Sequence, residues 1–216
     1  HIGTDGKFYI LDLSRVMPPV RPVKNGERGA HLFKMFRPEF LKTWRFYPLC
    51  SDAYSHFVIT QEDCEEHKKE VDEATKDLVG PTLSNFAQDL VHEIDEELEV
   101  SGELSAFSLP ETLHAHGINV RYLGHVVCRL GKHKYQKVLI VHMCARIIKS
   151  ELRKRLRDAM EEMKVSVDEP YRIVATEYLN LIFSDTKESE AYWQTGIVAA
   201  LDTKFDLRPQ NWKGFP

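Results

Sequence analysis

KYQKVLIVHMCARIIKSELRKRLRDAMEEM, residues 134–163, contains the longest regular apolar pattern in the sequence. Its apolar side chains recur at steps of three and four residues, with a mean close to the helical repeat of about 3.6. This set comprises Val138, Val141, Ala145, Ile148, Leu152, Leu156, Ala159 and Met163. The spacing predicts a long amphipathic α-helix over about 134–163, with this set forming its buried face.

The same predicted helix carries a dense run of positive charge. Between residues 146 and 157 the sequence has six basic residues and one acid, Glu151. Residues three or four apart share a helix face, so we predict one positively charged surface there. The residues assigned to it, as an RNA- or partner-binding site, are Arg146, Lys149, Arg153, Lys154 and Arg157.

Several roles remain open for this basic surface. It could bind RNA phosphates, an acidic protein segment or an anionic lipid head group. Binding to RNA would have an affinity that falls steeply with salt concentration. It also fits a structural role, because the acidic segments 62–77 and 92–99 can dock on it within the same molecule. Aromatic side chains, which stack on the bases of single-stranded RNA, do not interleave with these cations. We therefore rank a protein partner above RNA.

Most of the remaining sequence also has helical spacing. Residues 62–79 form a strongly acidic helical pattern that we expect Gly80-Pro81 to interrupt, with Pro81 starting the next helix. Ser108 begins the capping-box sequence SLPE, and Gly117 fits the end of that helix. Further helices are expected from Pro38 and over 120–130, 170–183 and 188–205. The predicted fold is mainly α, as a helix bundle or an armadillo-like domain, with a small N-terminal β-hairpin remnant.

The hairpin remnant is predicted from the first residues. Asp5-Gly6 is a signal for a two-residue type I′ turn, which needs a positive φ at both positions. Residues 7–13 are typical of a strand, but only residues 1–4 precede the turn as its partner. We therefore expect the chain to begin inside a larger domain.

Composition narrows the classes of function. The chain has 216 residues, a formal net charge of −4 and a pI of about 6.2, which argues against binding phosphate backbones over the whole surface. No apolar run reaches the roughly 18 residues that a membrane span needs. The histidines lack the spacing of zinc ligands, and no glycine-rich phosphate loop is present. We expect no metal site and no cofactor, and no small-molecule substrate is evident.

Two motifs resemble a known family. GTDGKFYILDLSRVMPP, residues 3–19, is similar to the signature G-[ST]-D-G-[RK]-x-Y-x-L-D-[LF]-x-R-x-x-P-P of the clustered mitochondria (CLU) domain. HAHGINVRYLGHV, residues 114–126, together with the basic helix, resembles the region just downstream, which is akin to a segment of a translation-initiation factor. LFKMFRPEFL, residues 32–41, fits the stretch between them. The chain thus resembles a divergent member, and the likeness covers residues 1 to about 160.

The resemblance implies a module of a larger cytoplasmic protein. Residues 1–48 would be the end of a CLU-like domain, with the hairpin, a proline-rich connector and a short helix, and residues 49–216 an α-helical region. CLU proteins are linked to mitochondrial distribution and to binding mRNAs for mitochondrial proteins. We therefore expect a non-catalytic interaction scaffold linked to mitochondrial distribution or translation, with RNA binding through the basic helix as an alternative.

A catalytic alternative depends on the first motif. Asp12 ends the predicted strand, which resembles the place where kinase-like folds hold a Mg²⁺-binding aspartate. Asp5 and Arg15 complete the set of candidate catalytic residues, since a guanidinium can contact a phosphoryl group. Acid–arginine pairs are more often structural, so we favour a non-catalytic role. A kinase-like phosphotransferase would also need residues upstream of His1 to bind its nucleotide.

Overall fold

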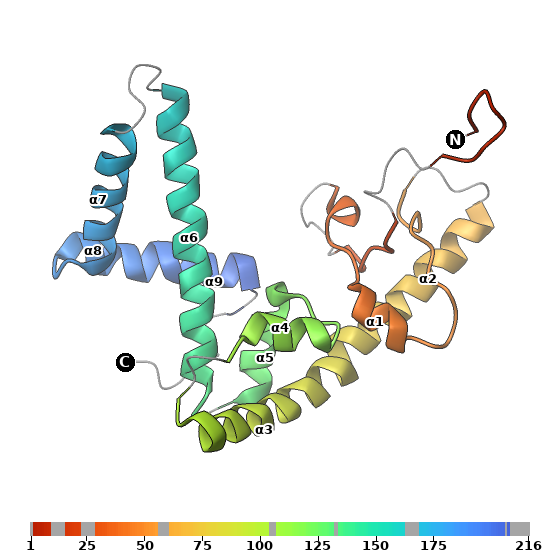
Figure 1. Ribbon diagram of the computed structural model, residues 1–216, viewed down its shortest axis with the longest axis horizontal. Helices are drawn as coiled ribbons and strands as arrows, with labels where there is room; N and C mark the ends of the chain where they lie inside the picture. The colour runs from red at the N-terminus through yellow and green to blue at the C-terminus, as the bar shows by residue number, and fades with distance from the viewer. Residues whose placement is uncertain are drawn as a thin grey trace. The chain divides into compact units, whose positions relative to one another are not determined.

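The computed structural model describes residues 2–9, 16–22, 29–55, 61–103, 107–131, 134–162, 169–205 and 207. Within these ranges the fold is mainly α, as the sequence predicted, and two isolated bridges take the place of any strand. None of the helices in this part of the chain is long and apolar enough to cross a membrane. The chain divides into two compact units, His1–Val120 and Arg121–Pro216 (Figure 1).

The first unit is organised around one continuous helical segment. Its α-helices are α1 (Pro38–Thr43), α2 (Gln61–Asp77), α3 (Leu83–Ser101) and α4 (Leu109–Ala115), with a 3-10 turn, η1 (Ala30–Leu32), before α1. A π-helical turn, η2 (Leu78–Thr82), joins α2 to α3, so the break predicted at Gly80-Pro81 is wrong. Pro81 lacks an amide hydrogen, and its ring would clash with the carbonyl four residues back. A π-turn widens the helix at this point and thereby accommodates the proline.

The core of the first unit follows the apolar face of this segment. The buried side chains are Val71, Ala74, Leu78, Leu83, Phe86, Leu90 and Ile94. They recur at steps of three and four, except for the step of five from Leu78 to Leu83 that spans η2. Since a π-turn holds one residue more than an α-turn, this longer step keeps both leucines on the same face. Leu109 and Leu113 of α4 are buried as well.

Gly117 ends the α4 segment, as predicted. Its φ of +72° is in the left-handed region, and a Cβ there would lie 2.4 Å from the backbone nitrogen of Phe40. Glycine therefore allows both the turn and the close approach to α1. Ser108 occupies the N-cap position of α4, but its side chain accepts no capping hydrogen bond, so the capping-box prediction is wrong. The backbone carbonyl of Ser108 instead accepts the first amides of the helix.

The N-terminal residues form a short hairpin with a different turn from the one predicted. Ile2 and Phe8 make an isolated antiparallel bridge. The amide of Gly6 donates to the carbonyl oxygen of Gly3 at 3.0 Å, so the turn is centred on residues 4–5. Gly6 follows with a φ of +73°, which is the pattern of a three-residue loop with a bulge rather than a two-residue type I′ turn.

The second unit is built around α6 (Gln136–Glu162), the long helix that the sequence predicted. Its other elements are η3 (Val120–Tyr122) leading into α5 (Leu123–Leu130), then α7 (Glu169–Phe183), α8 (Lys187–Tyr192), the π-turn η4 (Trp193–Ile197) and α9 (Val198–Phe205). α7 lies beside α6, while α8, η4 and α9 form one helical segment that also contacts α6 (Figure 1). α5 contacts both α6 and α9. The helices predicted over 170–183 and 188–205 are confirmed.

Candidate functional site: the basic face of the long helix

The first half of α6 buries a different face from the one predicted. Leu139, Ile140, Met143 and Ile147 are buried, whereas Val141 is 64% exposed and Ala145 is also exposed. Nearly every position from 138 to 148 is apolar, so two faces of the helix compete for burial. Contacts with α5 and α9 select the face that includes Met143.

The second half of α6 follows the prediction more closely. Ala159 is buried, and Ile148, Leu152 and Leu156 are half-buried. With 3.6 residues per turn, the buried face therefore rotates by nearly half a turn between the two halves of the helix. α7 lies beside this second half (Figure 1). The opposite side of α6, where most of the cations lie, stays in solvent.

All five cations assigned to the site are exposed. They are Arg146, Lys149, Arg153, Lys154 and Arg157. Among the residues that the structure describes, none of the five forms a hydrogen bond or an ion pair. Burial and, less strongly, the positive charge of Arg146 lower the pKa of the neighbouring His142. Glu161 is an exposed acid near the C-terminal end of the same face.

Arg155 has a different role from these cations. Its guanidinium lies over the ring of Tyr178 in α7, 4.9 Å from the ring centroid. Tyr178 is fully buried, and its hydroxyl lies 3.2 Å from that of Tyr192. Burial, followed by this hydrogen bond, raises the pKa of Tyr178. Arg155 therefore helps to attach α7 to α6 through a cation–π contact.

Lys204 of α9 adds a cation that sequence reasoning missed. Its Nζ donates to Oγ of Ser150 at 3.0 Å and lies 3.9 Å from Oε1 of Glu151. The single acid within the basic run is thus paired with a cation from another helix. No local pattern reveals this, because Ser150 and Lys204 are 54 residues apart in sequence. We define the basic face as Arg146, Lys149, Arg153, Lys154, Arg157 and Lys204.

The candidate catalytic residues are only partly described. Oδ2 of Asp5 accepts a hydrogen bond from the hydroxyl of Tyr9 at 2.7 Å, and Oδ1 accepts one from the amide of Lys7 at 3.1 Å. Both bonds lower the pKa of Asp5, and the bond from Tyr9 has the larger effect. Asp5 thus supports the local turn. Asp12 and Arg15 lie outside the described residues, and the kinase-like alternative stays a prediction.

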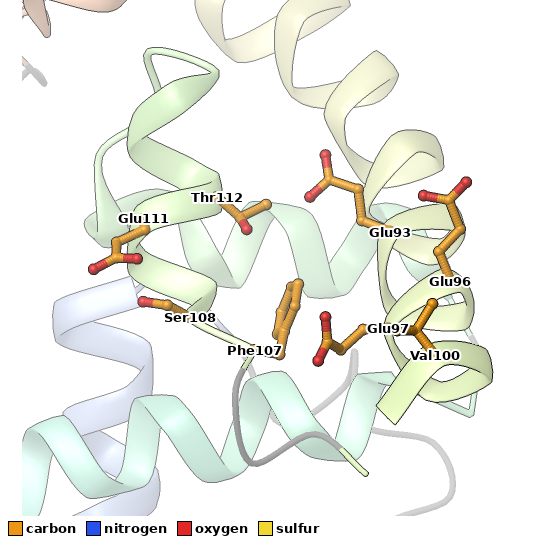
Figure 2. A pocket seen from close by; sticks show the side chains of 8 residues that line it. All are labelled: Glu93, Glu96, Glu97, Val100, Phe107, Ser108, Glu111 and Thr112. Atoms are coloured by element: carbon orange, nitrogen blue, oxygen red, sulfur yellow. The ribbon is translucent and has the colours of Figure 1, made fainter. Parts of the chain in front are cut away.

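A groove in the first unit gathers acidic side chains from α3 and α4 (Figure 2). It has a volume of about 470 Å³, and its lining includes Glu93, Glu96, Glu97, Val100, Phe107 and Glu111. Figure 2 shows that the carboxylates spread along the two helices instead of meeting at one point. Within the described ranges, no three metal-ligating side chains are close enough to hold an ion.

The cations of the basic face that lie on α6 fall in a region that is similar to a known family. Residues 103–200 match the family model of translation initiation factor eIF3 subunit 135. The match contains all of α6 and α7, so this part of the chain is a translation-initiation-factor-like helical region. It does not reach residues 3–19, where the resemblance to the CLU domain stays a prediction. No curated protein and no solved structure matches the chain.

Proposed function

We propose that the chain is a non-catalytic scaffold module in a translation-related protein assembly, and that the basic face binds an acidic segment of a partner protein. The observation that carries this proposal is the set of exposed cations on one side of α6, unpaired within the described residues. Like charges at this spacing repel each other, and a partner of opposite charge offsets that repulsion. The surrounding match to an initiation-factor subunit supports a role in protein assembly.

An exposed apolar side chain next to the cations favours a protein partner over RNA. Met160 is 53% exposed and lies three residues after Arg157, the spacing of neighbours on one helix face. Methionine and arginine are enriched in protein interfaces. Single-stranded RNA would instead use exposed aromatic rings, and the described part of the basic face has none. RNA binding through the same cations is the second candidate, favoured by their exposure and positive field.

The N-terminal motif extends the proposal. Residues 3–19 resemble the CLU signature, and on that basis we place the module in a larger cytoplasmic protein linked to mitochondrial distribution. Binding of an initiation-factor-like region to a partner would then connect this protein to translation. The support for this step is sequence resemblance alone.

The test compares two variants with the same change in net charge. One replaces Arg146, Lys149, Arg153 and Arg157 by alanine, and the control replaces the exposed, scattered Lys7, Lys42, Lys69 and Lys187 by alanine. Each is added to a translating cell extract, and its co-sedimentation with initiation complexes is measured on a density gradient. We expect the basic-face variant to bind about tenfold less, since charged contacts at an interface contribute at least that much.

Control measurements separate the candidates. Far-UV circular dichroism should show the same helicity for both variants and the parent chain. Equal co-sedimentation of the two variants would refute the assignment of the basic face. Filter retention of a single-stranded RNA by the purified parent chain, steeply salt-dependent and lost in the basic-face variant alone, would instead favour the RNA candidate.

A further inference from the structure

A second hollow in the first unit lies where the residues after α1 meet α2 and η2. Its volume is about 390 Å³, and its lining includes Trp44, Phe46, Tyr47, Glu73, Lys76 and Asp77. This volume lies within the range of about 300–1,000 Å³ that is usual for ligand pockets. We propose that this aromatic hollow binds a methylated ammonium group, carried by a protein side chain or by a free quaternary amine.

The orientation of the rings suits a compact cation. The rings of Trp44 and Phe46 have centroids 4.7 Å apart and planes at 60°. Those of Trp44 and Tyr47 have centroids 5.6 Å apart and planes at 80°. Such large angles make the rings adjoining walls around a rounded group. A planar nucleobase stacked on one of these rings would meet a neighbouring ring inclined to it by 60° or 80°.

Carboxylates at the edge of the hollow favour a positive ligand. Oε2 of Glu73 accepts a hydrogen bond from the hydroxyl of Tyr47 at 2.6 Å, and Oδ2 of Asp77 accepts one from Thr82 at 3.1 Å. Both carboxylates are acceptors in these bonds. Burial has the largest effect on the pKa of Tyr47, and the hydrogen bond to Glu73 and the negative charge of Glu73 add to it. Together they raise this pKa to about 12. Lys76 opposes them with one positive charge.

The aromatic wall is formed before a ligand arrives. The ring of Phe40, which is 2% exposed, stacks on that of Trp44 with centroids 6.0 Å apart and planes at 24°. Phe36 stacks on the other side of Phe40 at 5.0 Å. Phe46, in contrast, is 76% exposed, so the core does not account for its place in the wall. A preformed wall lowers the entropy lost on binding.

Methylation sets the specificity of such a site. Aromatic faces attract cations through their quadrupole, and quaternary ammonium groups are the ligands for which this recognition is best known. An unmodified lysine ammonium is strongly hydrated, so it loses more hydration free energy than a methylated ammonium when it leaves water. The hollow should therefore distinguish a trimethylated lysine from an unmodified one, even though both carry one positive charge.

Nuclear magnetic resonance titration of the whole chain tests the proposal. The probes are tetramethylammonium chloride, a short peptide with one trimethyllysine, and the same peptide with unmodified lysine, against sodium chloride at equal ionic strength. We expect both methylated probes to shift the signals of Trp44, and the two controls not to. Tighter binding of the methylated peptide than of tetramethylammonium identifies a protein side chain as the source. The reverse order identifies a free amine.

Variants link the signal to the hollow. Phe46→Ala should weaken binding of the methylated probes about tenfold, through loss of one cation–π wall. Glu73→Gln, which keeps an acceptor for Tyr47 but removes the charge, should also weaken it. Phe33→Ala, at a 56% exposed phenylalanine outside the hollow, is the matched control. The proposal is overturned if neither methylated probe shifts Trp44 or if Phe46→Ala binds like Phe33→Ala. It is also overturned if 7-methylguanosine monophosphate, whose planar base is positively charged, binds more tightly than both methylated probes.

Discussion

Replacing Gly124 by alanine should destabilise the second unit, although alanine is the better helix former. Gly124 is buried in α5 where this helix meets the end of α9. A Cβ at Gly124 would lie 1.8 Å from the carbonyl oxygen of Phe205 and 2.8 Å from its carbonyl carbon. The clashing atoms of Phe205 belong to the backbone, so no side-chain rotation relieves the contact and one helix has to move.

The magnitude follows from two opposing effects. Alanine in a helix interior gains about 0.5–1 kcal/mol over glycine. Overpacking costs about 1–3 kcal/mol, and a clash between two backbones belongs at the upper end of that range. The net loss of unfolding free energy should be about 2 kcal/mol. The displacement should also separate Lys204, next to Phe205 in α9, from Ser150, which it contacts at 3.0 Å.

Urea unfolding followed by far-UV circular dichroism measures this loss, and Gly80→Ala is the matched control. Gly80 is also in a helical segment, but a Cβ there meets no atom within 4 Å. The ring of Pro81 disfavours helical φ and ψ for a preceding residue that carries a Cβ, which offsets the helix gain of alanine, so Gly80→Ala should change the unfolding free energy by less than about 1 kcal/mol. If Gly124→Ala is as stable as the parent chain or more so, the close crossing of α5 and α9 is refuted.

Two further predictions concern single side chains. The pKa of Tyr47 is raised, by burial and by its bond to Glu73, from 10.0 to about 12, so the bond stabilises the fold fully below pH 10 and is lost as the pH rises to 12. Tyr47→Phe should thus lower the unfolding free energy by about 1 kcal/mol at neutral pH and progressively less above pH 10, and a constant difference across that range contradicts this. Burial raises the pKa of the Cys144 thiol, so a maleimide at neutral pH should modify the exposed Cys128 before Cys144. Mass spectrometry measures the order of modification, and the opposite order would contradict the partial burial of Cys144.

Sequence periodicity was sufficient for the helices and for part of the core. The apolar residues from Leu83 to Ile94 recur at helical spacing, and they are buried in the structure. The helix that contains the basic run was also predicted within a few residues of its observed bounds, Gln136–Glu162. These features depend on the order of residues along one segment, which a single sequence contains. The π-turn at Pro81 was missed because a proline after a glycine usually marks the end of a helix.

The candidate surfaces depended on the sequence to different degrees. The basic run of α6 is local, so spacing and charge are enough to predict its residues, and the structure leaves them exposed. Lys204 was missed because it reaches Ser150 from a segment 54 residues away. The aromatic hollow was missed for the same reason, since Trp44 and Tyr47 meet Glu73 only when the chain folds.

By itself, the sequence determined that the chain is helical, where its long helix lies and that this helix is basic. Only the tertiary structure decided which face of the first half of α6 is buried, because nearly all of its side chains from 138 to 148 are apolar. It also decided that α5 crosses α9 at Gly124. Helical periodicity comes from interactions between near neighbours along the chain. The choice between two equally apolar faces is made by the surfaces that distant segments present to them.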